Sequence, residues 1–342
     1  MRVAMYYNNS DIRIEDMSRP VCGPGEMIMK VEASGICGSD VMEWYRIKKA
    51  PLVLGHEVSG EIVEVGKGVK NFKMGDRIVA AHHVPCNTCS YCLTGHHTAC
   101  ETLRQTNFDP GGFAEYIRLP AINVDRGVFK IPDDISYEQA TFHEPLGCVL
   151  RALRVARLQP GQNVLVLGSG IAGLLMIHAA RELGACRILS VDPVPFRLDM
   201  AKQFGADEAI SPEEDPNAIL HKITGGRLAD LVVVCTGAEM AQYRALKSAE
   251  RGGVILFFAF PDPEVQISFS VMDVFGRNGR TLTTSYGASP RDSWAALELM
   301  QSPAIRVKDM ITHRLPLSET AKGFQLVEQA LDSMKVIIEP QR

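Results

Sequence analysis

The sequence predicts a two-domain protein that combines a doubly wound parallel α/β sheet with a compact β-barrel-like unit. A chain of 342 residues is long enough for about two domains. Residues 1–146 contain short apolar or alternating runs separated by glycine, proline and asparagine, which is the pattern of a small barrel. Residues 147–285 alternate strand-like and helix-like segments, which is typical of a parallel sheet covered on both faces.

Six runs near the N-terminus have the apolar or alternating pattern of β-strands. They are Val3–Tyr7, Ile12–Glu15, Met27–Ala33, Val58–Val65, Arg77–Ala81 and Phe113–Leu119. Turn-forming segments such as 8–10 and 20–25 separate them. We therefore expect these runs to form one β-barrel-like domain.

Four cysteines follow one another at the spacing Cys-x2-Cys-x2-Cys-x7-Cys. They are Cys86, Cys89, Cys92 and Cys100. Four thiolates on so short a segment can surround one zinc ion tetrahedrally, and the residues between them favour turns. Two disulfides or unrelated buried thiols are the alternatives, but the regular spacing favours zinc. Such a closed site would stabilise the loop and perform no chemistry, because the metal has no open position.

A glycine-rich turn joins the first strand of the second domain to a helix. The apolar run 163–167 is followed at once by Gly168, Gly170 and Gly173, and residues 174–184 have helical spacing with a glycine stop. Glycines at this spacing between a strand and a helix are typical of dinucleotide binding. The first permits a tight turn, the second lets the backbone approach a pyrophosphate, and the third lets the helix pack on the sheet. An ordinary strand–turn–helix is the alternative.

The residues after this turn select the cofactor. Unpaired N–H groups at the helix start, including those of Ile171 and Ala172, would bind phosphates. Asp192 ends the next expected strand, 187–191, and would accept hydrogen bonds from the adenosine ribose while repelling a 2′-phosphate. NAD is therefore favoured over NADP. Arg197 is close enough in sequence to cover the adenine or to soften this discrimination.

The alternation of strands and helices continues to the end of the chain. Further strands are expected at Leu231–Cys235, Val254–Phe258 and Met334–Ile338. Helices are expected at Phe196–Phe204, Met240–Ala249, Pro290–Gln301 and Leu317–Ala330.

Three separate loops carry a cysteine, a histidine and a glutamate. Cys37 lies in segment 35–40, His56 in segment 55–57, and Glu144 directly before a proline. Sulfur, imidazole and carboxylate from three loops could form a catalytic zinc site with an open position. A buried thiol, a hydrogen-bonded histidine and a surface carboxylate are the ordinary interpretations of the same residues, so their spacing alone leaves the question open.

Taken in order, these motifs resemble the zinc-containing medium-chain dehydrogenases, the superfamily of the alcohol dehydrogenases. The resemblance rests on Gly35–Asp40, Gly55–Glu57, the four-cysteine loop, Gly111–Tyr116 and Glu144–Leu146. The last motif resembles the sorbitol and threonine dehydrogenase branch. The resemblance implies a GroES-like catalytic domain formed by residues 1–146 and 286–342 and a Rossmann nucleotide domain formed by residues 147–285.

The resemblance also implies roles for individual residues. Cys37 and His56 would ligate the catalytic zinc ion, and Glu144 would be the third ligand or would bind it through a water molecule. Glu57 would be a supporting carboxylate or an alternating ligand. Ser39 matches the hydroxyl that hydrogen-bonds the substrate oxygen and passes its proton outward. With the four-cysteine loop, two zinc ions per chain are expected.

The expected proton route is interrupted in this sequence. Many relatives carry a histidine five residues after the ligand cysteine, where this chain has Met42. Glu43, His82, His83 or a chain of water molecules could replace it, although the two histidines could equally be a strand-end pair. The segment Trp44–Arg46 could line the substrate pocket or anchor the loop.

The resemblance implies an NAD-dependent zinc enzyme that interconverts a secondary alcohol, polyol or amino alcohol with its ketone, as a homodimer or homotetramer. Lys335 matches a basic position that often contacts the cofactor pyrophosphate, and an exposed lysine on a strand edge is the alternative. Three other functions are compatible with parts of the sequence. A zinc-free quinone reductase is disfavoured because both metal motifs are present. An NADP-dependent aldehyde or ketone reductase and a non-enzymatic zinc protein remain.

Composition excludes several other classes. A net charge of −4 and a pI near 6.2 argue against nucleic-acid binding. No apolar run approaches the roughly 20 residues that span a membrane. The N-terminus lacks the apolar segment of a secretory signal, and nine cysteines in such a chain are typical of a reducing cytoplasm.

Overall fold

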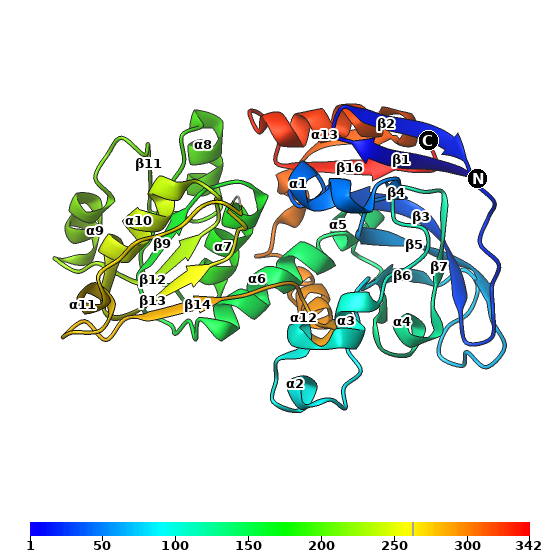
Figure 1. Cartoon of the computed structure of the whole chain (residues 1–342), viewed down its shortest axis with the longest axis horizontal. Helices are drawn as coiled ribbons and strands as arrows, with labels where there is room; N and C mark the ends of the chain where they lie inside the picture. The colour runs from blue at the N-terminus through cyan, green and yellow to red at the C-terminus, as the bar shows by residue number, and fades with distance from the viewer. Residues whose placement is uncertain (262) are drawn as a thin grey trace. The chain divides into compact units, whose positions relative to one another are not determined.

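The strands of this computed structural model form three sheets within the residues that it describes, 1–261 and 263–342 (Figure 1). The chain divides into two units, each of which is described by itself. One unit comprises Met1–Gly147 and Gly287–Arg342, and the other comprises Cys148–Tyr286. The chain therefore leaves the first unit once and returns to complete it.

The first unit contains a three-stranded and a seven-stranded sheet. The small sheet has the order β2-β1-β4. Its strands are β1 (Arg2–Asn8), β2 (Asp11–Asp16) and β4 (Leu52–Val53). The larger sheet has the order β15-β16-β3-β5-β6-β8, with β7 paired to β3. Its strands are β3 (Met27–Gly35), β5 (Glu57–Val65), β6 (Arg77–Ala80), β7 (Tyr116–Leu119), β8 (Val128–Lys130), β15 (Ile311–Pro316) and β16 (Lys335–Glu339).

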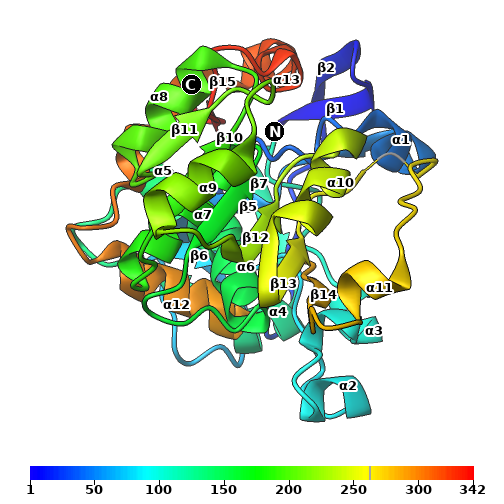
Figure 2. The same ribbon diagram turned by 90° about the vertical axis from the view of Figure 1, so that its left-hand side faces the viewer.

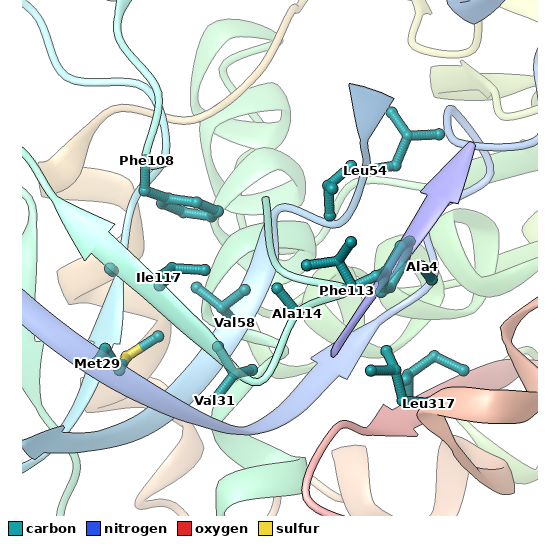
Figure 3. Close-up of a cluster of buried hydrophobic side chains, with 14 of the residues drawn as sticks. Ala4, Met29, Val31, Leu54, Val58, Phe108, Phe113, Ala114, Ile117 and Leu317 are labelled. Atoms are coloured by element: carbon teal, nitrogen blue, oxygen red, sulfur yellow. The ribbon is translucent and has the colours of Figure 1, made fainter. Parts of the chain in front are cut away.

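A continuous apolar cluster fills the first unit. Met29 and Val31 from β3 meet Val58 from β5, Ile117 from β7 and Phe113 (Figure 3). These side chains are at most 1% exposed. Burial of each such side chain stabilises the fold by about 1.5–3 kcal/mol. The strands that carry the candidate metal ligands are thus held on a packed core.

Short helices connect the strands of the first unit. They are α1 (Glu43–Arg46), α2 (Ser90–Leu93), α3 (Glu101–Gln105), α4 (Ala121–Arg126), α5 (Tyr137–Ala140), α12 (Pro290–Met300) and α13 (Thr320–Gln329), with 3-10 turns η1 (Ile47–Lys49), η2 (His97–Ala99), η3 (Val307–Met310) and η4 (Leu317–Glu319). Ser136 and Gln139 form a capping box at α5, and Ser289 and Asp292 form one at α12, because each pair satisfies N–H groups that the first turn leaves unpaired. Helix α6 (His143–Val155) begins in this unit and ends in the other.

The second unit contains one six-stranded sheet whose neighbouring strands are all parallel. Its order is β11-β10-β9-β12-β13-β14. The strands are β9 (Val164–Leu167), β10 (Ile188–Val191), β11 (Glu208–Ile210), β12 (Ala229–Val234), β13 (Ala249–Phe257) and β14 (Thr281–Thr284). Numbered from β9, this order is 3-2-1-4-5-6, the order of the Rossmann fold.

Helices cover both faces of this sheet (Figures 1 and 2). They are α7 (Ile171–Glu182), α8 (Pro195–Gln203), α9 (Pro216–Thr224), α10 (Glu239–Ser248) and α11 (Val271–Val274). Leu165 and Leu167 of β9 share a buried cluster with Leu220 of α9 and Leu246 of α10. The intervening residue, Val166, faces α7, because successive side chains of a strand point to opposite faces.

The expected fold class is confirmed, and the differences have local causes. The run expected to be a strand from Phe113 enters β7 only at Tyr116, because the carbonyl of Phe113 accepts a hydrogen bond from Ala4 of β1 at 2.9 Å. Strand β13 begins at Ala249, five residues before the apolar run at Val254, and pairs there across a register shift. In the part of the chain that the structure describes, no helix has the length and apolarity needed to span a membrane.

Candidate functional site

Two neighbouring strand ends bring the candidate catalytic ligands together. Strand β3 ends at Gly35, which lies opposite Glu57, the first residue of β5. Cys37 follows β3 by two residues and His56 precedes β5 by one. The ligand atoms of Cys37, His56 and Glu57 all lie within 4.8 Å of one another. The antiparallel register between the two strands thus assembles a thiol, an imidazole and a carboxylate.

A glycine motif far along the chain fixes the turn before His56. Gly55 has a φ of +91°, which favours glycine, and its carbonyl accepts a hydrogen bond from the N–H of Gly112 at 2.9 Å. A Cβ atom at Gly112 would lie 2.3 Å from a methyl group of Val58. The Gly-Gly-Phe motif can therefore approach the turn closely only because it lacks side chains there.

The carboxylate of Glu57 forms an ion pair with Lys335. The Lys335 ammonium donates hydrogen bonds to Glu57 Oε2 and, at 3.3 Å, to the carbonyl oxygen of Ile36. Both charged side chains are buried, at 0% and 1% exposure. A Cβ atom at Gly35 would lie 2.0 Å from the Glu57 carboxylate, so that glycine makes room for the pair. The charge of Lys335 is thus paired within the first unit. Strand β16 lies between β15 and β3, so Lys335 is not an exposed lysine on a sheet edge.

Asp40 orients two of the candidate ligands from a fully buried position. Its Oδ2 accepts a hydrogen bond from the N–H of Cys37 at 3.0 Å, and its Oδ1 lies 3.4 Å from His56 Nδ1. Burial lowers the pKa of His56, but the Asp40 carboxylate more than offsets this and raises the pKa well above its usual value. A carboxylate on Nδ1 leaves Nε2 to face a metal and increases its basicity.

Arg46 binds this same loop from helix α1. Its Nε donates to the carbonyl of Ser39 at 2.9 Å, and its Nη2 donates to Ser39 Oγ at 2.9 Å and to Asp40 Oδ1 at 3.2 Å. Ser39 Oγ in turn lies 3.4 Å from Cys37 Sγ, to which it donates. Ser39 is therefore positioned next to the candidate metal ligand.

Three more histidines lie near His56. The ring centroids of His82 and His56 are 4.9 Å apart, and those of His82 and His83 are 3.9 Å apart. Burial lowers the pKa of His82 well below its usual value, that of His83 to about 4 and that of His143 to about 3. Neither ring nitrogen of the fully buried His143 has a hydrogen-bond partner within residues 1–261 and 263–342. All three imidazoles are therefore neutral at physiological pH.

Glu144 is placed differently from the other candidate ligands. It lies in the first turn of α6 and is buried, but it is not one of the three residues whose ligand atoms cluster within 4.8 Å. Glu43, which the sequence offered as a relay residue, is exposed, and its carboxylate lies 3.4 Å from the N–H of Asn9.

The residues of this cluster fit a zinc ion. Zinc accepts thiolate, imidazole and carboxylate ligands, and its ligand atoms in a tetrahedral site are about 3.3–3.8 Å apart. The observed spacing of up to 4.8 Å needs only a small contraction. Asp40 already faces the far nitrogen of the histidine, which is the arrangement that supports metal-binding histidines.

The four-cysteine loop also has the geometry of a zinc site. The sulfur of Cys86 lies 3.6 Å from that of Cys100 and 4.0 Å from that of Cys92, which in turn lies 3.6 Å from that of Cys89. Four thiolates around zinc are about 3.8 Å apart, whereas a disulfide has a length of about 2.05 Å. All four cysteines are free, so paired disulfides are excluded in this structure.

The thiol groups of this loop differ in their pKa values. The N–H groups of Thr88 and Cys89 donate to Cys86 Sγ at 3.4 and 3.3 Å and lower the pKa of that thiol to about 5. Burial raises the pKa of Cys92 to about 12. Cys92 therefore keeps its proton in the absence of a cation. A divalent cation would favour four thiolates, because it would offset their mutual repulsion.

The glycine turn of the second unit has the shape of a phosphate cradle. Gly168 has a φ of +96°, and a Cβ atom at Gly173 would lie 1.9 Å from the carbonyl oxygen of Gly168. At Gly170 the closest atom to such a Cβ is Arg197 Nη1, at 3.8 Å. The turn is thus closed towards the sheet and open above Gly170. The N–H groups of Ile171 and Ala172 lie in the first turn of α7, which has no side-chain cap.

Asp192 and Arg197 both lie close to this turn. The Asp192 carboxylate is 3% exposed and accepts hydrogen bonds from the N–H groups of Ser169 at 2.7 Å and Val194 at 2.9 Å. Each carboxylate oxygen keeps a lone pair that a ribose hydroxyl can use. Arg197 approaches Gly170, and its Nε is buried without a partner in the described chain. The turn, the carboxylate and the open space fit a dinucleotide.

The sequence did not predict the roles of two residues of the site, Asp40 and Arg46. Asp40 lies inside the Gly35–Asp40 motif but received no role, although an acidic residue three positions after a ligand cysteine is the signal that could have assigned it. Arg46 was expected only to line the pocket or anchor the loop, because nothing in the sequence indicates that a helical turn aims it back at Ser39.

Family models match most of the chain. Residues 23–133 match the alcohol dehydrogenase GroES-like domain, and residues 172–302 match the zinc-binding dehydrogenase domain. The first match includes the ligand cluster and the four-cysteine loop, and the second begins at Ala172, within the glycine turn.

Whole-chain relatives carry related names. The chain is 35% identical to an L-threonine 3-dehydrogenase of Bacillus licheniformis, over 92% of this chain and 91% of that protein. It is 31% identical to a sorbitol dehydrogenase of Bacillus subtilis, over 100% of this chain and 98% of that protein. The crystal structure of 2R,3R-butanediol dehydrogenase from Bacillus subtilis matches with a TM-score of 0.86 and 29% identity, over 99% of each chain. The chain therefore belongs to the zinc-containing medium-chain dehydrogenases, in the sorbitol and threonine dehydrogenase branch.

Proposed function

We propose that this chain is an NAD-dependent zinc enzyme that oxidises a secondary alcohol, a polyol or an amino alcohol to its ketone, and that it catalyses the reverse reduction. The observation that carries the proposal is the cluster of Cys37, His56 and Glu57, with Asp40 behind the histidine. The names of the relatives, which include threonine, sorbitol and butanediol dehydrogenases, support the class of substrate.

Cys37 and His56 would hold a catalytic zinc ion, with Glu144 as a further ligand or as the acceptor of a bound water. Zinc in such a site acts as a Lewis acid that lowers the pKa of a substrate hydroxyl. Glu57, paired with Lys335, would support the site from behind. Ser39 would hydrogen-bond the reacting oxygen of the substrate, because its hydroxyl lies 3.4 Å from the sulfur of Cys37.

The second unit would bind the cofactor that accepts the hydride. Gly168, Gly170 and Gly173 would shape the turn, and the N–H groups of Ile171 and Ala172 would bind the pyrophosphate. Asp192 would accept the ribose hydroxyls and favour NAD. Lys335 was expected to reach the pyrophosphate, and for this it would have to exchange its bond with Glu57.

The four-cysteine loop would hold a second, structural zinc ion through Cys86, Cys89, Cys92 and Cys100. Its role would be to fold the loop, since four thiolates leave no open position. From the family resemblance we also propose a homodimer or homotetramer, which light scattering of the purified protein would distinguish.

An NADP-dependent reductase is the second candidate, because Arg197 reaches the opening above Gly170 and could face a 2′-phosphate. Titration with both cofactors distinguishes the two. A tighter affinity for NAD supports the first proposal, and a strong preference for NADP supports the second.

The decisive experiment measures zinc per chain in the wild type and in Cys37→Ser, together with NAD reduction by a panel of polyols and amino alcohols. We expect about two zinc ions to fall to about one, with activity lost. An unchanged zinc content in the variant would overturn the catalytic site as proposed.

A further inference from the structure

Arg46 holds Ser39 by both its backbone and its side chain. Its Nε donates to the Ser39 carbonyl at 2.9 Å and its Nη2 donates to Ser39 Oγ at 2.9 Å. Two parallel donors from one planar guanidinium fix the rotamer of the serine, which a single flexible contact would not. The Arg46 side chain is only 15% exposed.

The same guanidinium is neutralised within the loop. Its Nη2 lies 3.2 Å from Oδ1 of the fully buried Asp40, which also binds the N–H of Cys37. The positive charge is therefore balanced and is not free to bind a carboxylate on a substrate. What it offers to the site is a pair of fixed N–H donors.

Arg46 lies four residues after Met42, which holds the sequence position of the expected relay histidine. Met42, which occupies that sequence position, accepts a backbone hydrogen bond from the N–H of Arg46 at 3.1 Å. Residues four apart in such a turn lie on the same face. The thioether of Met42 cannot take up a proton at neutral pH. The side chain from this turn that contacts the Ser39 hydroxyl is instead that of Arg46.

We propose that Arg46 is a positioning residue that keeps Ser39 as a hydrogen-bond donor to the reacting oxygen and takes no part in carrying the proton outward. This inference rests on the proposed function. A guanidinium has no acceptor and stays protonated, so it cannot take a proton from Ser39. Because Nη2 occupies one lone pair of Ser39 Oγ, the serine hydroxyl donates in another direction. Cys37 Sγ accepts that hydrogen bond at 3.4 Å, and a reacting oxygen beside this sulfur would replace it as the acceptor.

The proton balance of the reaction follows from this arrangement. Oxidation of an alcohol transfers one hydride from carbon to the cofactor and releases the hydroxyl proton. Ser39 keeps its own proton throughout and donates it as a hydrogen bond to the oxygen that gains negative charge. The hydroxyl proton of the substrate passes to water by a path that does not include Arg46. Arg46 thus strengthens the donor that stabilises the charged oxygen.

A purely structural role for Arg46 makes a different prediction. If the arginine mattered only by holding Asp40, its removal would have the same effect whether or not residue 39 carried a hydroxyl. If it acts through the Ser39 hydroxyl, its removal should have little effect once that hydroxyl is gone. A double-mutant cycle separates the two.

The test uses the zinc-loaded enzyme with NAD bound and 2,2,2-trifluoroethanol, an alcohol whose fluorines suppress hydride loss. Its affinity is measured by calorimetry for the wild type, Ser39→Ala, Arg46→Gln and the double variant. We expect each single variant to weaken binding by roughly 10- to 100-fold, because a hydrogen bond to a charged oxygen is lost or weakened. The double variant should be no more than about threefold weaker than Ser39→Ala.

Zinc content and thermal unfolding are measured in the same samples, and Arg46→Lys serves as a second variant that keeps the charge but loses the planar pair of donors. We expect it to retain zinc and to bind the alcohol between the wild type and Arg46→Gln. Multiplicative losses in the double variant would overturn the proposal, as would loss of zinc from both arginine variants. A wild type that binds no trifluoroethanol and reduces neither NAD nor NADP with any alcohol would overturn the proposed function as well.

Discussion

Lys335 and Glu57 form a fully buried ion pair although they are 278 positions apart in the sequence. The pair joins the first residue of strand β16 to the first residue of strand β5, and Gly35 between them leaves the space that the two side chains occupy. Removing one partner of such a pair leaves the other charge buried and unpaired, which is more costly than removing both.

The first prediction concerns this pair. We expect Lys335→Met to lower the free energy of unfolding by about 3–5 kcal/mol, and the double variant with Glu57→Gln to recover part of that loss. Urea unfolding monitored by circular dichroism measures both, with zinc content determined in parallel. The matched control is Lys322→Ala, which breaks an exposed pair with Glu319 and should change stability very little. Equal losses from Lys335→Met and Lys322→Ala would contradict the prediction.

The second prediction separates the two metal sites. Cys89→Ser should lower zinc content by about one ion per chain while leaving the Cys37 and His56 site loaded. The loop from residue 86 to residue 100 should then become sensitive to protease, because its fold depends on the metal rather than on a large core. Mass spectrometry of zinc and limited proteolysis check both results. The exposed Cys186→Ser is the control; a loss of both zinc ions from Cys89→Ser would show that the sites are not independent.

The third prediction contrasts two glycines of the same turn. Gly173→Ala places a methyl group 1.9 Å from the Gly168 carbonyl, so we expect it to destabilise the protein by about 1–3 kcal/mol. Gly170→Ala meets no protein atom closer than 3.8 Å, so its melting temperature should be unchanged. Its methyl group fills the opening above the turn, and NAD affinity should fall at least about tenfold. Thermal unfolding and cofactor titration test the pair, and normal NAD binding by Gly170→Ala would refute the assignment of this opening to the pyrophosphate.

The fourth prediction concerns pH. Burial raises the pKa of Asp207, but the N–H of Ile188 at 2.7 Å and the Arg181 guanidinium at 2.5 Å more than offset this and leave the pKa below its usual value. A carboxylate with a lowered pKa stabilises the fold above its unfolded pKa, and this contribution is lost as pH falls through the folded value. Asp207→Asn should therefore lower the free energy of unfolding by about 2 kcal/mol at neutral pH.

The difference between Asp207→Asn and the wild type should then narrow as the pH falls below about 4. Urea unfolding at a series of pH values measures it. Asp134→Asn is the control, since Asp134 is exposed and its removal should matter little at any pH. A difference that stays constant across the series would mean that the loss at Asp207 does not come from its charge.

Much of the fold could be predicted because its signals are local. The apolar run 163–167, the glycine turn and the helix after it follow one another directly, and the structure shows β9, Gly168–Gly173 and α7 there. Short strands gave no such signal. Strand β4 has two residues and β8 has three, so neither shows a period, and each forms only because a longer neighbour offers unpaired backbone groups.

Some residues of the candidate site could also be predicted from local motifs, and others could not. Cys37 and His56 were named from motifs, and the pairing of Gly35 with Glu57 brings them together. The position of Lys335 could not be predicted, because burial of a lysine depends on a carboxylate 278 residues away and on the missing side chain of Gly35. The contact of Arg46 with Ser39 depends on the path of a four-residue helix, which no sequence period reveals.

The place of β16 between β15 and β3 sets an order in which the two clusters can assemble as the chain is synthesised. The four cysteines lie close together between residues 86 and 100, whereas Glu57 gains its ammonium partner only after residue 335 has been made. Until then the first unit carries the Glu57 carboxylate without its counter-charge, and a chain cut before residue 335 never acquires it.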